Sequence, residues 1–482
     1  MINFRIIARI FGLLLIVEGF FMLVCAGISF IYRESTVASF LFSALATIVT
    51  GIIVFNPLKN EEKISGNKEG YIIISAIWLV YGIFGALPFL LSGSVDNFGD
   101  AFFESMSGFT TTGATIFTNI EALPHGILFW RSLTQWIGGI GIILISLSVF
   151  PVVKSINIQV AVTDFYGQST DKIQPRIIDS VKRLVLIYFF LTLSEVILLV
   201  IGGMPVFDAV CHSFTTLSTG GFSTRNNNIA AFDSPFIKVV LTIFMFIAGT
   251  NMTLIYFGLK RNFRKISGNN EFIFYTLTSL VFIVLGSFVL FFIKGFHQGD
   301  AFTDSAFQVV SIITTTGYCV QNYNLWGNLM IFILFLLMFS GGTIGSTSGS
   351  TKIIRFLLIA RNNRQELKRL IHPNAVIPVR LDKHTIPQSI IHNLLIFITL
   401  YFMIVCSGAM IISMMGYDIT TSFSTSASML GNIGPGIGTF GPFTNYSSLP
   451  TGGKYFLSGL MLLGRLGLFP VMILFGRSFY KN

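Results

Sequence analysis

Charged residues are scarce in this sequence. Asp, Glu, Lys and Arg make up 11% of its 482 residues, whereas 53% are hydrophobic. In soluble domains roughly a quarter of the residues are charged, so a soluble globular fold is excluded and a membrane protein is predicted. Cysteine is also sparse, and the four cysteines stand in separate segments without CxxC spacing: Cys25, Cys211, Cys319 and Cys406. They predict neither a disulfide framework nor a metal site.

The usual signatures of an enzyme are weak as well. The six histidines form no metal-ligand pair at helical spacing, and the apolar segments contain no Ser/Lys or paired-Asp arrangement. An intramembrane enzyme is therefore only a remote alternative, and no catalytic residue is predicted. The segments GGIGI and GPGIG lack the strand-to-helix setting of a dinucleotide site, so we expect no nucleotide on this chain.

Long apolar runs dominate what is present. Runs of about 20 residues can cross the hydrocarbon core of a bilayer, and ten such spans are predicted: 8–31, 36–56, 71–92, 127–150, 183–203, 236–258, 273–294, 327–359, 389–415 and 454–478. The first two form an N-terminal two-helix hairpin, and the other eight pair into four units, so that the predicted domains are 1–68, 69–170, 171–265, 266–372 and 373–482. Such an internal repeat predicts an all-α polytopic membrane protein, with four tandem span/pore-loop/span units around one pseudo-fourfold pore.

The distribution of charge predicts the topology. The net charge of +10 comes from short connections between spans and not from one patch, which favours positive-inside bias over a nucleic-acid partner. Both termini and the connections between units are expected in the cytoplasm. These connections carry Lys59, Lys63, Lys68, Lys154, Lys172, Arg176, Lys182, Arg183, Arg261, Arg264, Lys265, Arg361, Arg364, Lys368, Arg369, Arg380 and Lys383. The opposite connections are acidic and predict a vestibule that concentrates cations, although acids at helix starts explain the same pattern: Asp96, Asp100, Glu104, Glu121, Asp208, Asp233, Asp300, Asp304 and Asp418.

A Gly/Thr-rich motif recurs between the two spans of each unit. Three copies place a glycine thirteen positions after an acid: Asp100 and Gly113, Asp208 and Gly221, Asp304 and Gly317. The fourth copy, GNIGPGIG, is looser, because Gly431 lies thirteen positions after Asp418 and Gly434 lies sixteen after it. Both glycines stay open as the fourth member.

The repeated motif has the chemistry of a cation filter. Non-helical backbone at membrane depth is tolerated only where protein or a water-filled pore surrounds it. Glycine lets carbonyl groups turn toward a common axis, and four such loops can replace the hydration shell of a cation. Re-entrant turns or close helix contacts are the alternative. The predicted filter residues are Thr110, Thr111, Thr112, Gly113, Ser218, Thr219, Gly220, Gly221, Thr314, Thr315, Thr316, Gly317, Gly431, Asn432, Ile433 and Gly434.

Two features interrupt the apolar spans of the second half. SGGTIGSTSGSTK (340–352) is too rich in glycine and serine for an undisturbed helix, and it predicts either tight helix packing or an intramembrane gate that contains Gly341, Gly342, Gly345 and Gly349. Arg465 lies inside the last predicted span, where an arginine costs at least about 2.5 kcal/mol. We expect it to face the pore as part of the gate and to repel the permeating cation. Glu195 is the other intramembrane charge that we single out, either as a hydrogen-bonded helix contact or as a functional site.

Seven motifs in this order resemble those of potassium-uptake membrane subunits of the Trk/Ktr/HKT superfamily, most closely the bacterial Trk type (TrkH/TrkG): FFESMSGFTTTGAT, QWIGGIGIIL, HSFTTLSTGGFST, GGTIGSTSG, RQELKRLIHP, GNIGPGIG and LLGRLGLFP. The resemblance covers essentially the whole chain. It implies a homodimer in the bacterial inner membrane with one pore per subunit, a gating loop in the third unit, a pore arginine at Arg465, and regulation by a cytosolic nucleotide-binding ring that is TrkA-like. It also implies K⁺ in the filter at Thr111, Thr112, Ser218, Thr219, Thr315, Thr316, Asn432 and Ile433.

The sequence departs from the family pattern at two places. The position two after the pore arginine is often acidic in Trk members and is Gly467 here, and Tyr318 and Cys319 follow the third filter glycine. The expected function is gated, selective conduction of K⁺ for uptake. K⁺ symport coupled to H⁺ or Na⁺ is the alternative, with Glu195 as the candidate proton group.

Overall fold

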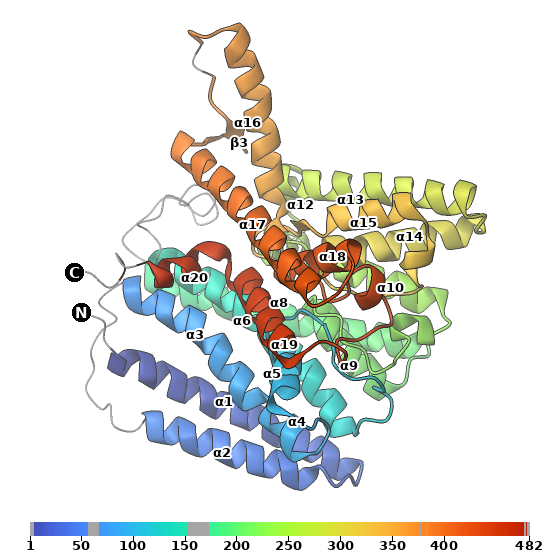
Figure 1. Ribbon diagram of the computed structural model, residues 1–482. Helices are drawn as coiled ribbons and strands as arrows, with labels where there is room; N and C mark the ends of the chain where they lie inside the picture. Colours follow the sequence, from blue (N-terminus) through green and yellow to red (C-terminus); the bar gives the residue numbers. More distant parts are fainter. Residues whose placement is uncertain are drawn as a thin grey trace.

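Helices account for most of the residues that the computed structural model describes, which are 4–55, 67–152, 173–375, 377–382, 384–476 and 479 (Figure 1). Both chain ends, the predicted boundary at 170/171 and five of the basic residues used for topology lie outside these ranges: Lys59, Lys63, Lys154, Lys172 and Lys383. Within the described residues, six helical segments are long and apolar enough to cross a membrane, and two bent helix pairs raise the number to eight. The predicted class of all-α polytopic membrane protein is confirmed.

The N-terminal hairpin consists of α1 (Phe4–Ile31) and α2 (Val37–Phe55), which pack side by side at one edge of the bundle (Figure 1). In the turn between them, the Glu34 carboxylate accepts hydrogen bonds from the first two backbone N–H groups of α6 (His125–Val152), at 2.5 and 3.0 Å. A carboxylate at a helix N-terminus stabilises the helix. The hairpin is therefore attached to the first unit through this cap.

Each of the four units follows the predicted order of span, short helix, loop and span. The first contains α3 (Asn67–Gly85), α4 (Leu87–Leu91), α5 (Phe98–Phe109) and α6; the second contains α8 (Ile173–Ile201), α9 (Val206–Leu217), η1 (Asn228–Ala231), α10 (Pro235–Ala248) and α11 (Met252–Leu259). The third follows α12 (Phe263–Ser267) and contains α13 (Asn270–Phe288), the π-helical turn η2 (Val289–Ile293), α14 (Gln298–Ile313), η3 (Tyr323–Leu325), α15 (Asn328–Leu337) and α16 (Ile353–Ile371). The fourth contains α17 (Gln388–Met414), α18 (Ile419–Gly431), η4 (Gly438–Phe440), α19 (Thr451–Leu466) and α20 (Leu468–Phe475).

Two of the predicted spans are bent in the structure. The span at 236–258 bends by 110° between α10 and α11, and the span at 454–478 bends by 115° between α19 and α20. The first break begins at Gly249, and the Asn251 side chain caps the new helix by accepting a hydrogen bond from the N–H of Thr253 at 2.8 Å. The second break is at Gly467, whose φ of 80° is readily adopted only by glycine. Neither bend was predicted from the sequence.

The third unit is interrupted where the sequence indicated. Two short parallel strands, β1 (Ser340–Gly341) and β2 (Thr351–Lys352), bring together the two ends of the Gly/Ser segment between α15 and α16. Beyond it, α16 and the hairpin of β3 (Arg380–Leu381) and β4 (His384–Thr385) project from the other helices (Figure 1).

The hydrophobic core is divided into two large clusters that enclose the short helices. Units two and three supply most of one cluster, and the N-terminal hairpin with units one and four supplies the other. The short helices α5, α9, α14 and α18 are buried although they contain many hydroxyl groups; in α18, ten residues are buried, and six of them are serine or threonine. Polar helices of this kind are stable in a membrane only when protein surrounds them. The short helices of the repeated motif therefore lie at the centre of the fold.

Candidate filter, intramembrane loop and pore arginine

The four short helices end in loops with the same backbone conformation. One residue in the left-handed region is followed two positions later by a glycine with positive φ. The left-handed residues are Thr111, Thr219, Thr315 and Asn432, with φ of 52°, 54°, 60° and 53°. The glycines are Gly113, Gly221, Gly317 and Gly434, with φ of 83°, 76°, 79° and 100°. Left-handed conformations in non-glycine residues cost energy and concentrate at functional sites, so four copies point to a shared role.

The four glycines form a closed ring of contacts with the carbonyl groups of the neighbouring loops. A Cβ built on Gly113 would lie 2.0 Å from the carbonyl oxygen of Gly220. The equivalent distances are 1.9 Å from Gly221 to Thr316, 1.9 Å from Gly317 to Ile433, and 2.5 Å from Gly434 to Thr112, which returns to the first loop. Each oxygen belongs to the residue just before the next glycine. A cavity of about 90 Å³ adjoins the ring and is lined by all four glycines.

The structure places Gly434, and not Gly431, at the fourth ring position. Gly431 is the last residue of α18 and does not have a positive φ. The spacing from acid to glycine differs in the fourth copy because Asp418 is the N-cap of α18, whereas Asp100 and Asp208 lie within the first turns of their helices. The position thirteen before Gly434 is occupied by Thr421, and hydrogen bonds from that residue hold the pKa of the Asp418 carboxyl below its ordinary value.

The loops differ in how their side chains support the ring. In the first and third loops, the hydroxyl groups of Thr110 and Thr112 lie 2.8 Å apart and those of Thr314 and Thr316 lie 2.9 Å apart. The second loop has Gly220 at the place of the second hydroxyl, and Gln135 from α6 donates to its carbonyl oxygen at 2.8 Å. Gln135 also accepts a hydrogen bond from Phe222 N–H at 3.2 Å. Sequence reasoning missed this residue, although it opens the motif QWIGGIG.

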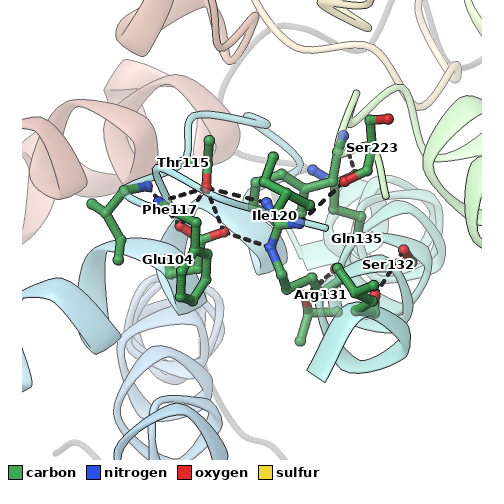
Figure 2. A network of polar contacts seen from close by, with 12 residues as sticks. Glu104, Thr115, Phe117, Ile120, Arg131, Ser132, Gln135 and Ser223 are labelled. Atoms are coloured by element: carbon green, nitrogen blue, oxygen red, sulfur yellow. Dashed lines mark hydrogen bonds and ion pairs between the residues drawn. The ribbon is translucent and has the colours of Figure 1, made fainter. Parts of the chain in front are cut away.

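A buried ion pair lies just beyond the ring, as Figure 2 shows. Arg131 of α6 donates to Glu104 of α5 at 2.7 Å, to the Thr115 hydroxyl at 3.1 Å and to the Ser223 carbonyl at 3.2 Å. Its side chain is 1% exposed and that of Glu104 is 0% exposed. Sequence reasoning did not single out Arg131, yet a charge inside the predicted span 127–150 was a usable signal.

Four acids of the expected vestibule form ion pairs with basic residues. Lys454 pairs with Asp100 at 2.5 Å, Arg225 with Asp208 at 2.7 Å, and Lys238 with Asp304 at 3.1 Å. Together with the Arg131–Glu104 pair, these contacts occupy four of the nine acids on which the expectation rested. Asp100 and Asp208 lie in the first turns of α5 and α9, as the alternative expected, whereas Glu104 and Asp304 lie further along α5 and α14.

The intramembrane loop between β1 and β2 lies directly against the ring on the side where the short helices end. Gly349 N–H donates to the Thr315 hydroxyl at 2.7 Å, and the Thr347 hydroxyl lies 3.0 Å from the Leu217 carbonyl and 3.1 Å from the Ala248 carbonyl. Three of its glycines permit close backbone contacts, because a Cβ would lie 2.4 to 2.6 Å from a carbonyl oxygen at Gly341, Gly342 and Gly349; Gly345 has a φ of 77°. The loop therefore fits between units two, three and four.

Arg465 of α19 also contacts this loop. Its guanidinium group donates to the carbonyl oxygens of Thr347 at 2.7 Å and Gly138 at 3.1 Å, and the residue is 4% exposed. Among the described residues, no acid lies within ion-pair distance of it. The arginine thus connects the loop to α6 through backbone carbonyls and keeps a full positive charge beside the ring.

Glu195 lies in α8, away from these contacts. It is completely buried, and within the described part of the chain neither carboxyl oxygen has a hydrogen-bond partner. It does not line the cavity beside the ring. Its carboxyl group does, however, interact with Thr216 at the end of α9, two residues before the predicted filter residue Ser218.

The fold and the geometry of the ring define a membrane transport protein of the pore-loop class. The family described as TrkH, cation transport protein, matches residues 36–479. The chain is 35% identical to the Trk system potassium uptake protein TrkH of Salmonella typhimurium, over 100% of both sequences. It is 30% identical to the Trk system potassium uptake protein TrkG of Escherichia coli, over 99% of both sequences. The crystal structure of the potassium transporter TrkH from Vibrio parahaemolyticus superposes with a TM-score of 0.91 at 31% identity, covering 100% of both chains. The chain belongs to the TrkH family of cation transport proteins and is not an enzyme.

Proposed function

We propose that this chain mediates K⁺ uptake by selective conduction through the ring of loops. The names of its relatives as potassium uptake proteins support this function. The observation that carries it is the closed ring in which the Thr112, Gly220, Thr316 and Ile433 carbonyls each lie against the ring glycine of the preceding loop. Rings of carbonyl oxygens replace the hydration shell of K⁺ in selective pores. We assign K⁺ sites to Thr111, Thr112, Ser218, Thr219, Thr315, Thr316, Asn432 and Ile433.

A flux assay tests the proposal directly. The purified protein is reconstituted into liposomes that are loaded first with K⁺ and then, in a second preparation, with Na⁺. The outward gradient of the loaded ion drives ⁸⁶Rb⁺ uptake, which is measured. We expect uptake driven by K⁺ and much weaker uptake driven by Na⁺. Equal rates with both ions would contradict a selective ring.

We further propose that the intramembrane loop and Arg465 form the gate. Because the loop contacts Thr315 and is held by Arg465, it obstructs the path below the ring until it moves. Thr347→Val removes a hydroxyl that contacts two carbonyl groups while preserving the size of the side chain. One lost hydrogen bond of about 1 kcal/mol corresponds to a roughly fivefold higher K⁺ flux without any cytosolic partner.

Thr242→Val is the matched control for this variant. Among the described residues, the Thr242 hydroxyl bonds only to the Lys238 carbonyl of its own helix, at 2.7 Å, so its loss should leave flux close to that of the parent protein. If Thr347→Val and Thr242→Val give the same flux, the loop serves helix packing and not gating.

The partners proposed are a second copy of this chain and a cytosolic nucleotide-binding TrkA-like ring. The projecting helix α16 supports a docking role, because Leu367, Leu370 and Ile371 are 64%, 78% and 72% exposed beside several basic residues. Exposed apolar residues of this kind mark interaction surfaces. In this proposal the chain lies in the inner membrane, with α16 and both termini on the cytoplasmic side. Cross-linking from α16 in intact membranes tests the contact.

Coupled K⁺ symport is a second candidate that one observation favours, namely the complete burial of the Glu195 carboxyl in α8. If protons move with K⁺, an inward proton gradient should drive K⁺ uptake against its own gradient, and Glu195→Gln should abolish that component. Uptake in liposomes that depends only on the K⁺ gradient and the membrane potential would exclude coupling.

A further inference from the structure

The four short helices share a polar position that faces the outer part of the loops. Nine residues before the ring glycines lie Glu104, His212, Gln308 and Thr425. Glu104 accepts hydrogen bonds from the Thr115 hydroxyl and Ile116 N–H, both beyond Gly113. His212 Nε2 lies 3.0 Å from the Ser223 hydroxyl, and Gln308 donates to the Tyr318 carbonyl at 3.3 Å. In the first three of these helices, the side chain at this position supports the chain that leaves the ring.

The first unit alone completes this support with an arginine. Arg131 uses three different nitrogen atoms for Glu104, the Thr115 hydroxyl and the Ser223 carbonyl. Thr115 lies two positions beyond Gly113, and Ser223 lies two positions beyond Gly221. The guanidinium group also stacks over the Phe222 ring, 4.3 Å from its centroid. A single side chain therefore joins the first and second loops at equivalent heights (Figure 2).

Stability alone is a poor reason for this arrangement. A buried ion pair often contributes no more to folding than apolar residues of the same volume, because both charges must be removed from water. The planar fork of arginine, however, fixes the directions of several hydrogen bonds at once, which the single ammonium group of lysine does not. The geometry therefore specifies the separation of two loops and not merely the burial of a charge.

We infer that Arg131, oriented by Glu104, is a positioning residue for ion selection. It holds the first and second loops at the separation at which the carbonyl groups of the ring replace the hydration shell of K⁺. Arg131 acts through the loops, and the inference rests on the proposed ring. The first and second loops are joined in this way, so the ring is asymmetric although its four glycines are equivalent.

The test is the K⁺/Na⁺ permeability ratio of Arg131→Lys in liposomes. Lysine keeps the charge opposite Glu104 but cannot reach both loops with fixed geometry. Loss of one charge-assisted contact is expected to lower the ratio about tenfold, which is equivalent to about 1.4 kcal/mol, while total cation flux is retained or increased. Thr115→Val is the second variant, because it removes the Arg131 contact with the first loop, together with the bonds of the same hydroxyl to Glu104 and Phe117 N–H, and leaves the Arg131–Glu104 bond; a smaller fall in the ratio is expected.

Glu34→Gln is the matched control, because Glu34 caps the same helix α6 but contacts no loop of the ring. It should lower thermal stability without changing the ratio. A ratio unchanged in both Arg131→Lys and Thr115→Val, in protein that is inserted and conducts, would overturn the inference. If substitutions of the ring glycines change the ratio and these two do not, only the positioning role fails; if the glycine substitutions also have no effect, the proposed ring itself fails.

Discussion

Gly317→Ser is expected to lower the K⁺/Na⁺ permeability ratio by about tenfold or more, the consequence of strain of at least 1 to 2 kcal/mol at a residue with positive φ. The φ of Gly317 is 79°, and a Cβ at this position would lie 1.9 Å from the Ile433 carbonyl oxygen. That oxygen belongs to the proposed ring, so the added side chain must displace an ion ligand. The change therefore acts on selectivity more than on the rate of conduction.

The closed ring extends this prediction to the other three glycines. A Cβ on Gly113 or Gly221 would approach a carbonyl oxygen of the next loop as closely as 2.0 and 1.9 Å, and on Gly434 as closely as 2.5 Å. Serine at each position should reduce the ratio, with the smallest effect at Gly434, where the contact is loosest. Gly431→Ala should change the ratio less than Gly434→Ser, because a Cβ at Gly431 would meet its nearest neighbours at 3.2 Å.

Permeability ratios from reversal potentials or paired flux assays measure these effects. Gly299→Ala is the control in the third unit, because a Cβ there would meet no atom within 4 Å. Ratios in Gly113→Ser and Gly317→Ser equal to that of the parent protein would remove the ring from the selectivity mechanism.

Arg465→Ala is expected to raise K⁺ flux by roughly thirtyfold when no regulatory partner is present. A unit charge about 8 Å from a permeating cation, at an effective dielectric constant of about 20, opposes it by roughly 2 kcal/mol, which is about thirtyfold in occupancy. Removal of the guanidinium group also releases the Thr347 carbonyl and so loosens the intramembrane loop. The permeability ratio should hardly change, because the ring itself is untouched.

Arg465→Lys separates the two contributions. Lysine keeps the positive charge but loses the fork that joins Thr347 to Gly138. If Lys gives the low flux of the parent protein, the barrier is electrostatic; if it gives the high flux of Ala, the hydrogen bonds hold the gate closed. Arg264→Ala is the control for loss of charge, because Arg264 is exposed and lies outside the ring and the loop.

A protein that is correctly inserted but does not conduct after Arg465→Ala would contradict both contributions. It would mean that Arg465 braces the pore. Thermal stability measured in detergent distinguishes this case, because a brace should also lower the melting temperature, whereas release of a gate should not.

The sequence by itself determined the membrane class, the repeat and the composition of the loops. These properties are local: an apolar run of sufficient length crosses a bilayer whatever surrounds it, and a glycine with its flanking threonines is visible at each copy. It also located the interruption at 340–352 and the arginine at 465. The position of Gly434 was not decided by counting, because Asp418 caps its helix from outside while the other acids lie within theirs.

Only the tertiary structure decided which groups meet. Arg465 and Gly138 are separated by 327 residues, and Asn432 and Thr112 by 320, so no local pattern contains their contact. The bend at Gly249 likewise involves another unit, since the intramembrane loop occupies this break through bonds to the Gly249 and Ala248 carbonyls. Arg131 shows the same limit: its charge was visible in the sequence, but its three acceptors come from a helix and two loops that only folding brings to one place.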